Sequence, residues 1–161
     1  MADLPGKPRE DHVSIDFFTV PTIRFQVLYV FVVLAHDRRR ILHFNLRDRD
    51  GIFGADFTKE VQNLGIEEVL SAPRSPWQRA YIERVIGSIR PECIDQVIVF
   101  NEELLRRHMK SYVRYYHETR THLSLEKDTP ASRSVQPPDL GQLVALPQVG
   151  GLHHRYERRA A

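Results

Sequence analysis

Three acidic residues stand where carboxylates could hold a divalent metal. Asp16 lies within VSIDFFTV, whose other residues are mostly apolar. A carboxylate in such a stretch needs a partner, because an unpaired charge among apolar neighbours is costly. Asp48 follows in RDRDG, and Glu83 comes 35 positions after Asp48. Mg²⁺ prefers hard oxygen ligands, so this set predicts a magnesium site.

Two such ions, about 3.5–4 Å apart, can clamp the attacking and leaving oxygens of a phosphodiester. Each acid also has a simpler interpretation. Asp16 could face solvent on an edge strand, and Asp48 could serve a turn. Glu83 could pair with Arg79 or Arg90 at helical spacing. The sequence leaves both interpretations open for each residue.

The elements that would position these acids begin with three strands. Residues 13–20 are rich in β-branched and aromatic side chains, which is typical of a strand. Residues 25–35 (FQVLYVFVVLA) are almost continuously apolar, which predicts a strand buried on both faces. Residues 40–45 follow a tight polar turn at 36–39. We therefore expect the third strand to run antiparallel to the second.

Helical periodicity appears after these strands. It predicts a helix over 56–65, then a short strand over 67–72 and a loop over 73–78. A second helix carries Ile82, Val85 and Ile89 on one face and is expected to end before Pro91. Asn101 is a good N-cap for a third helix that runs to about Glu118. This order predicts an α/β fold with a mixed sheet flanked by helices.

Length and composition limit the organisation. The 161 residues suit one domain, which we divide into a leader (1–11), a core (12–133) and a tail or loose extension (134–161) rich in Pro, Gly and basic residues. Cys93 is the single cysteine, which excludes an intramolecular disulfide. No apolar run approaches the roughly 20 residues of a membrane span. The N-terminus has no signal-peptide pattern, so we expect a cytoplasmic protein.

The kind of basic residue, rather than the net charge, is what indicates a polyanionic partner. The net charge is +2, but 19 of the 23 basic residues are arginines, whose planar group suits phosphate. Arg106, Lys110 and Arg114 form a row at helical spacing. The alternative is a solvated face on which Glu102 and Glu103 pair with Arg106 and Arg107, a set of ion pairs four residues apart.

A resemblance is carried by four stretches: SIDFFTV, RDRDGIFGADF, APRSPWQRAYIERVIGSIRPECID and YYHETRTHLSLEKDTPA. Residues 12–133 resemble the integrase core domain of bacterial insertion-sequence transposases, which are relatives of retroviral integrases. The resemblance implies a ribonuclease H-like fold and an acidic triad that cuts and joins DNA with Mg²⁺ or Mn²⁺.

Carried over by motif, the triad is Asp16, Asp48 and Glu83. Asp50 is the rival for the second position, but Asp48 leaves 34 residues before Glu83, nearer to the spacing that the family implies. The resemblance also implies DNA as partner and leaves a homo-oligomer open. Candidate DNA contacts are Arg79, Arg90, Lys110 and Arg114.

The spacing of the first two acids departs from the family pattern. Asp16 and Asp48 lie only 32 positions apart, where relatives carry an additional helix and strand. The sequence therefore predicts an internal truncation and leaves enzymatic activity undecided. Two functions stay open: a catalytic domain for DNA integration and transposition, and a non-catalytic transposase remnant that at most binds DNA.

Overall fold

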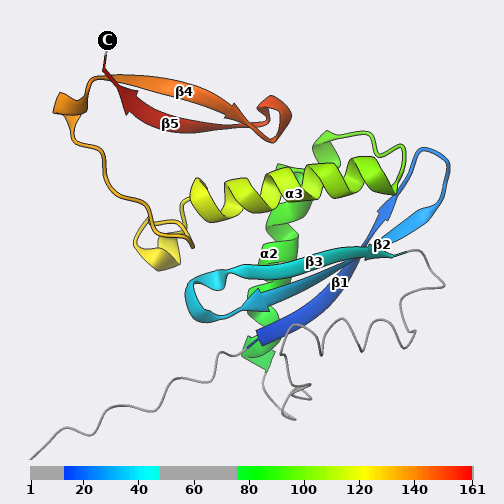
Figure 1. The fold of residues 1–161 in the computed structure, drawn as a ribbon. Coiled ribbons are helices and arrows are strands. Elements are labelled where there is room, and N and C mark those ends of the chain that lie inside the picture. The colour runs from blue at the N-terminus through cyan, green and yellow to red at the C-terminus, as the bar shows by residue number, and fades with distance from the viewer. Residues whose placement is uncertain (1–12, 48–75, 161) are drawn as a thin grey trace, which may run out of the picture.

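The computed structural model describes residues 13–47 and 76–160. Figure 1 shows a sheet covered by two crossing helices, followed by a separate hairpin. The strands and helices, in order, are β1 (Val13–Pro21), β2 (Val27–Ala35), β3 (Ile41–Arg47), α2 (Pro76–Glu92), α3 (Glu102–Glu118), β4 (Gln142–Gln148) and β5 (His153–Arg159).

The first sheet has the order β1-β2-β3, and both of its strand pairs are antiparallel. β2 lies in the centre and is buried at Leu28 and from Val30 to Ala35, as its continuous apolar run predicted. A 3₁₀ turn, η1 (Asp37–Arg39), joins it to β3. The predicted antiparallel hairpin is therefore confirmed, with β3 extending two residues beyond the expected end.

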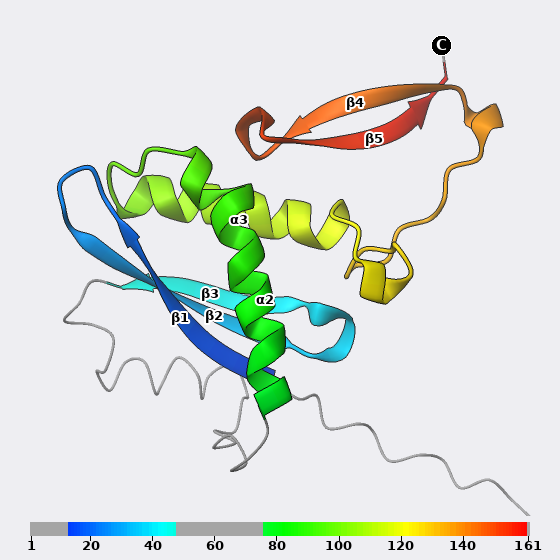
Figure 2. The same cartoon turned by 180° about the vertical axis from the view of Figure 1, so that it is seen from behind.

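Both helices pack on the same face of this sheet (Figure 2). Successive side chains of a strand point to opposite faces. In β1, Phe18 and Val20 point toward the helices and are buried with Val30 and Val32 of β2. The principal core lies between the sheet and the helices, with α2 contributing Ile82, Val85 and Ile89 and α3 contributing Leu105, Met109, Tyr112 and Tyr116.

The third predicted helix is confirmed as α3. The side chain of Asn101 accepts a hydrogen bond from the Leu104 amide at 2.9 Å, which is the expected N-cap contact. Met109 and Tyr112, on the predicted apolar face, are fully buried. The start of the helix is therefore specified by its own sequence, while its position in the fold depends on packing against the core.

Helix α2 is longer at both ends than predicted. It begins at Pro76, inside the expected loop, because proline at a first helical position loses no hydrogen bond. It also passes Pro91 and ends at Glu92, so the proline costs one backbone hydrogen bond close to the helix end. The Cys93 amide still donates to the Ile89 carbonyl at 3.0 Å, so the helical bonding continues beyond the proline.

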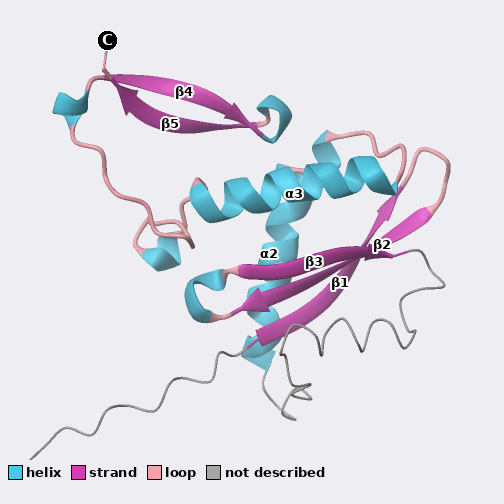
Figure 3. Cartoon of the chain, in the orientation of Figure 1, coloured by secondary structure: helices cyan, strands magenta, loops and turns pink. Residues whose placement is uncertain are grey.

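The C-terminal segment is a β-hairpin rather than a loose extension. β4 and β5 pair antiparallel over their whole length, as Figure 3 shows in magenta. Val149, at the turn, is 3% exposed and belongs to the principal core. The His153 ring stacks on Tyr115 with centroids 4.3 Å apart. These contacts attach the hairpin to α3.

Several predictions lie outside the described residues: the leader, Asp48, Asp50, the helix over 56–65 and the strand over 67–72. The described part is a mixed α/β arrangement, compatible with a ribonuclease H-like core. The loss of one helix and one strand stays a prediction, as do the domain boundaries. Neither α2 nor α3, among the described helices, is long and apolar enough to cross a membrane.

Candidate active site

Asp16 lies in the middle of β1, opposite Val32 of β2. It shares the helix-covered side of the strand with Ser14 and Phe18, and Phe18 is only 6% exposed. Asp16 itself is half-buried, and its Oδ1 accepts a hydrogen bond from the Phe17 amide at 2.8 Å. The carboxylate is thus held on the face where the helices pack, rather than on a solvent-facing side.

Glu83 lies in the second turn of α2 and is exposed. Its neighbour Ile82 points into the core and is 1% exposed. Within the described part of the chain, the Glu83 carboxylate has no hydrogen bond or ion pair, so the predicted pairing with Arg90 does not form. An exposed carboxylate without a protein partner is free to bind a cation.

Arg90 shows which way this side of α2 faces. Glu83 and Arg90 are seven residues apart, which places them within about 20° of each other around the helix. Arg90 donates to the Thr19 carbonyl of β1 at 2.9 Å, and its guanidinium lies 5.5 Å from the centre of the Phe18 ring. The side of α2 that carries Glu83 therefore faces the β1 edge, where Asp16 lies.

β1 is an edge strand of the sheet formed by the described residues. Across residues 13–47 and 76–160, β1 pairs with β2 alone. In the same ranges, no cluster of three or more acidic, histidine or cysteine side chains has the geometry to hold a metal ion. The predicted third ligand, Asp48, lies outside these ranges. Asp16 and Glu83 supply oxygen donors of the kind that Mg²⁺ and Mn²⁺ accept.

The candidate DNA contacts occupy different surroundings. Lys110 and Arg114 are exposed on α3, whereas Arg90 is engaged with β1. Nothing is described of the Arg79 side chain. Arg106 pairs with Glu102 at 2.6 Å, as the solvated-face interpretation predicted, and also donates to Asn45 Oδ1 at 3.0 Å.

A polar network that the sequence did not indicate joins the ends of the two helices. Arg120 Nε and Nη2 donate to the Glu92 carboxylate at 2.8 and 2.6 Å. The Tyr112 hydroxyl donates to the same carboxylate at 2.8 Å. Arg120 also donates to Ser88 Oγ at 3.3 Å. The network holds α3 against the last turn of α2, and thereby fixes the helix that carries Glu83.

The pKa shifts agree with this network. Burial raises the pKa of Glu92, but hydrogen bonds from Arg120 and Tyr112 outweigh it, so that the pKa lies below its ordinary value. The hydrogen bond to Glu92 raises the pKa of Arg120 despite burial. Both groups are therefore charged at neutral pH, and the ion pair is formed.

His117 and His122, at either side of Arg120, are held in packed surroundings. His117 Nε2 accepts from the Ile41 amide of β3 at 3.0 Å, and burial and the Arg40 charge lower its pKa. His122 is 6% exposed, and burial followed by the Arg120 charge lowers its pKa to about 4. Both rings are neutral at pH 7.

Asp128 organises the turn that follows α3. Its carboxylate accepts from the amides of Thr129 and Arg133, at 2.7 and 3.0 Å, and from Ser132 Oγ at 2.9 Å. Arg38, in the β2–β3 turn, donates to it at 2.7 Å. These hydrogen bonds hold the pKa of Asp128 far below its usual value. The contact ties the sheet to the segment after α3.

Comparison with known proteins agrees with this arrangement. The family model described as the integrase core domain matches residues 64–130. The match includes Glu83 and the Arg120 and Asp128 clusters, while Asp16 and Asp48 lie before it. Residues 64–130 are thus similar to the integrase core domain, in line with the resemblance seen in the sequence.

The chain is also similar in sequence to a protein from an insertion element. Insertion element IS476 uncharacterized 39.2 kDa protein of Xanthomonas euvesicatoria is 32% identical over 83 residues. The alignment covers 48% of this chain and 24% of that protein, so the chain spans about a quarter of the relative's length. No solved structure matches the chain significantly.

The integrase core motifs can now be divided by role. In YYHETRTHLSLEKDTPA, Arg120 and Asp128 make the contacts that connect α3 to α2 and to the sheet. In ERVIGS, by contrast, Glu83 makes no contact that would explain it structurally within the described residues. Cys93 is fully buried, and burial raises the pKa of its thiol to about 11, so it is a packing residue.

Proposed function

We propose that this chain is the catalytic region of a DNA transposase of the integrase type, with Asp16, Asp48 and Glu83 as its metal-holding carboxylates. The observation that carries the proposal is the orientation of α2. Arg90, on the same side of the helix as Glu83, reaches β1 three positions beyond Asp16. Two acids far apart in the sequence thus belong to elements that contact each other, α2 and the edge strand β1 of the described sheet.

Charge and burial support the same proposal. Asp16 is half-buried on the helix-covered side of β1, a costly position for a carboxylate without a cation nearby. Glu83 is exposed on α2 and has no ion pair to any described residue. A divalent cation between the two acids would offset both charges. The lineage of the integrase core segment gives DNA as the substrate class.

The bound ions would supply a Lewis acid and an activated water or 3′-hydroxyl. Asp16 would hold its ligand oxygen rigidly, because it is anchored in a paired strand and bonded to the Phe17 amide. Glu83 would follow any movement of α2, whose position depends on Ile82 and Ile89 in the core. The protein's part is thus to hold two carboxylates toward one phosphodiester.

Nicking of supercoiled plasmid with Mg²⁺ or Mn²⁺ tests the proposal. We expect the full chain to nick DNA slowly and without sequence preference. Glu83→Gln keeps the side chain's shape but removes a ligand charge, so it should abolish nicking while leaving DNA binding intact. Glu103→Gln is the matched control, since Glu103 is exposed on α3 and has no described partner. Nicking that survives Glu83→Gln would refute the assignment.

The second candidate is a non-catalytic remnant that binds DNA through its basic groups. The short spacing of Asp16 and Asp48 favours it, because only 31 residues lie between these two acids. This candidate predicts DNA binding with no metal-dependent nicking by the wild-type chain. It also predicts that Glu83→Gln and Glu103→Gln behave alike.

A further inference from the structure

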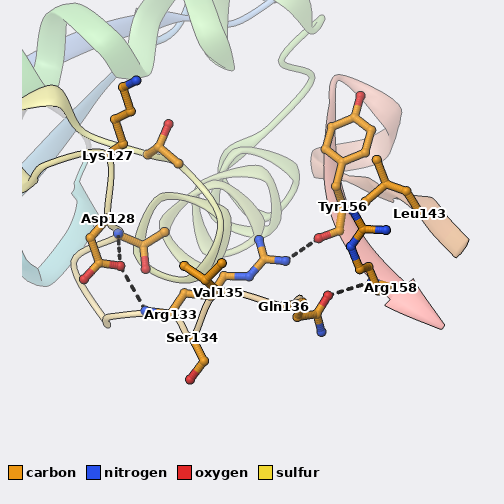
Figure 4. Close-up of a pocket in the computed structure, with 11 residues that line it drawn as sticks. Lys127, Asp128, Arg133, Ser134, Val135, Gln136, Leu143, Tyr156 and Arg158 are labelled. Atoms are coloured by element: carbon orange, nitrogen blue, oxygen red, sulfur yellow. Dashed lines mark hydrogen bonds between the residues drawn. The ribbon is translucent and has the colours of Figure 1, made fainter. Parts of the chain in front are cut away.

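A basic groove lies between the turn after α3 and the C-terminal hairpin. Its volume is about 310 Å³, and it is lined from one side by residues 121–136 and from the other by β4 and β5. Figure 4 shows Arg133 extending across it from the loop to the Tyr156 carbonyl, to which it donates a hydrogen bond. Arg158 and Lys127 also line it.

The positive charge of this groove is not balanced by its own acidic residue. Asp128 is the carboxylate in the lining, and it is paired with Arg38 and satisfied by local donors. Glu157 lies on the other side of β5, where Arg155 pairs with it at 2.6 Å. Lys127, Arg133 and Arg158 therefore present three cationic groups without an ion pair to a described residue.

Exposed apolar surface accompanies these charges. Along β5 the side chains alternate, so that His153 and Arg155 face α3 while Tyr156 and Arg158 face away. Tyr156 is 54% exposed and Leu143, on the neighbouring strand, is 60% exposed. An exposed aromatic ring among arginines is typical of surfaces that contact nucleic acids, where rings pack on sugars and bases.

Two further features lie in or next to the lining of the groove. Thr129, which lines it, is 2% exposed and its hydroxyl has no hydrogen-bond partner among the described atoms. Glu126 and Lys127 both adopt left-handed backbone conformations, with φ of 56° and 67°. Such conformations are unfavourable for non-glycine residues and persist where the surrounding structure requires a particular orientation.

We propose that this groove binds the phosphate backbone of DNA, as a contact separate from the carboxylates of Asp16 and Glu83. The choice of DNA as the ligand rests on the proposed function. It places the backbone contact on the C-terminal hairpin and the turn after α3, in addition to the predicted row on α3. Lys127 and Arg158 neutralise phosphates, Arg133 holds the hairpin to the loop, and Tyr156 supplies an apolar contact.

Fluorescence anisotropy with a labelled DNA duplex, measured over about 50–200 mM salt, tests the groove. We expect the Lys127→Gln/Arg158→Gln double variant to bind about 10- to 30-fold more weakly near physiological salt. The slope of log affinity against log salt should fall by about 2, because two phosphate contacts are lost. Tyr156→Ser, at an exposed position, should weaken binding without changing that slope.

The matched control is Arg107→Gln, an exposed residue on α3 with no described ion pair. Thermal melting checks that each variant folds. If wild type binds DNA but the double variant keeps its affinity and salt slope, the groove proposal is refuted and the proposed function stands. If wild type binds no DNA at any salt, the proposed function and the groove fail together. Lys127→Gln alone, at an exposed side chain, should lower the slope by about 1.

Discussion

Replacing Arg120 by alanine should destabilise the fold through the Glu92 network. The side chains of Arg120 and Glu92 are 23% and 25% exposed, and two nitrogens of Arg120 hold both carboxylate oxygens. Breaking a fully buried pair of this kind costs about 3–5 kcal/mol. Partial exposure lets water reach the abandoned carboxylate. We therefore expect a loss of about 2–3 kcal/mol in the free energy of unfolding, below the fully buried range.

For a chain of this length, each kcal/mol corresponds to about 2–4 °C in melting temperature. Arg120→Ala should therefore melt about 5–10 °C below wild type. Arg120→Lys should recover only part of the loss, because an ammonium cannot make the two-pronged contact. Arg107→Ala is the control, since Arg107 is exposed and unpaired within the described residues.

Urea denaturation measures the same free energy at constant temperature. The pKa of Glu92 is lowered in the folded state, so its contribution is present above the ordinary value near 4.5 and is lost as the pH falls below it. The difference between wild type and Arg120→Ala should therefore shrink in acid. A difference below about 0.5 kcal/mol at pH 7, the usual size for a surface substitution, would refute the role given to the network.

Further predictions concern single side chains. An NMR titration of His122 should give a pKa of about 4. Because this pKa lies below the unfolded value, the free energy of unfolding should fall as the pH drops from about 6.5 toward 4. A normal pKa would show that the ring is not buried. Asn101→Ala should cost about 1 kcal/mol by thermal melting, because the α3 N-cap is lost; an unchanged melting temperature would contradict the cap. Phe25, 94% exposed at φ 60°, should accept glycine with a gain of about 1 kcal/mol and less light scattering; a loss of stability would show that the ring makes a contact.

Local patterns were sufficient for the sheet and for α3. The continuous apolar run of β2 and the N-cap at Asn101 depend on neighbours in the sequence, so both could be predicted. The passage of α2 through Pro91 could not, because the cost of a proline depends on how close it lies to the helix end.

The C-terminal hairpin shows where local patterns fail. β5 is HHRYERR, and nothing in that charged run suggests a strand. Its position comes from contacts with distant residues, such as the His153 hydrogen bond to the Glu92 carbonyl at 2.7 Å. Likewise, the role of Arg120 could not be predicted from the sequence, because its partner Glu92 lies 28 positions earlier. The groove between the hairpin and the turn is lined by separate segments of the chain, so no local sequence pattern could predict it.

The candidate site was partly accessible from the sequence. Asp16 stood out as an acid inside an apolar strand, and Glu83 as an acid beside an apolar helical stripe. The sequence could not show that the side of α2 bearing Glu83 faces β1, because that depends on the Arg90 contact with Thr19. The role of Asp48 over Asp50 stays a prediction that rests on spacing.

Mn²⁺ binding to the full chain, followed by electron paramagnetic resonance, tests the central claim most directly. Asp16→Asn and Glu83→Gln should each weaken binding at least tenfold, and the double variant should lose little more, because both carboxylates hold the same ions. Glu103→Gln should bind Mn²⁺ as wild type does. If both single variants keep wild-type affinity, or if their effects are independent and additive, Asp16 and Glu83 do not form one metal site.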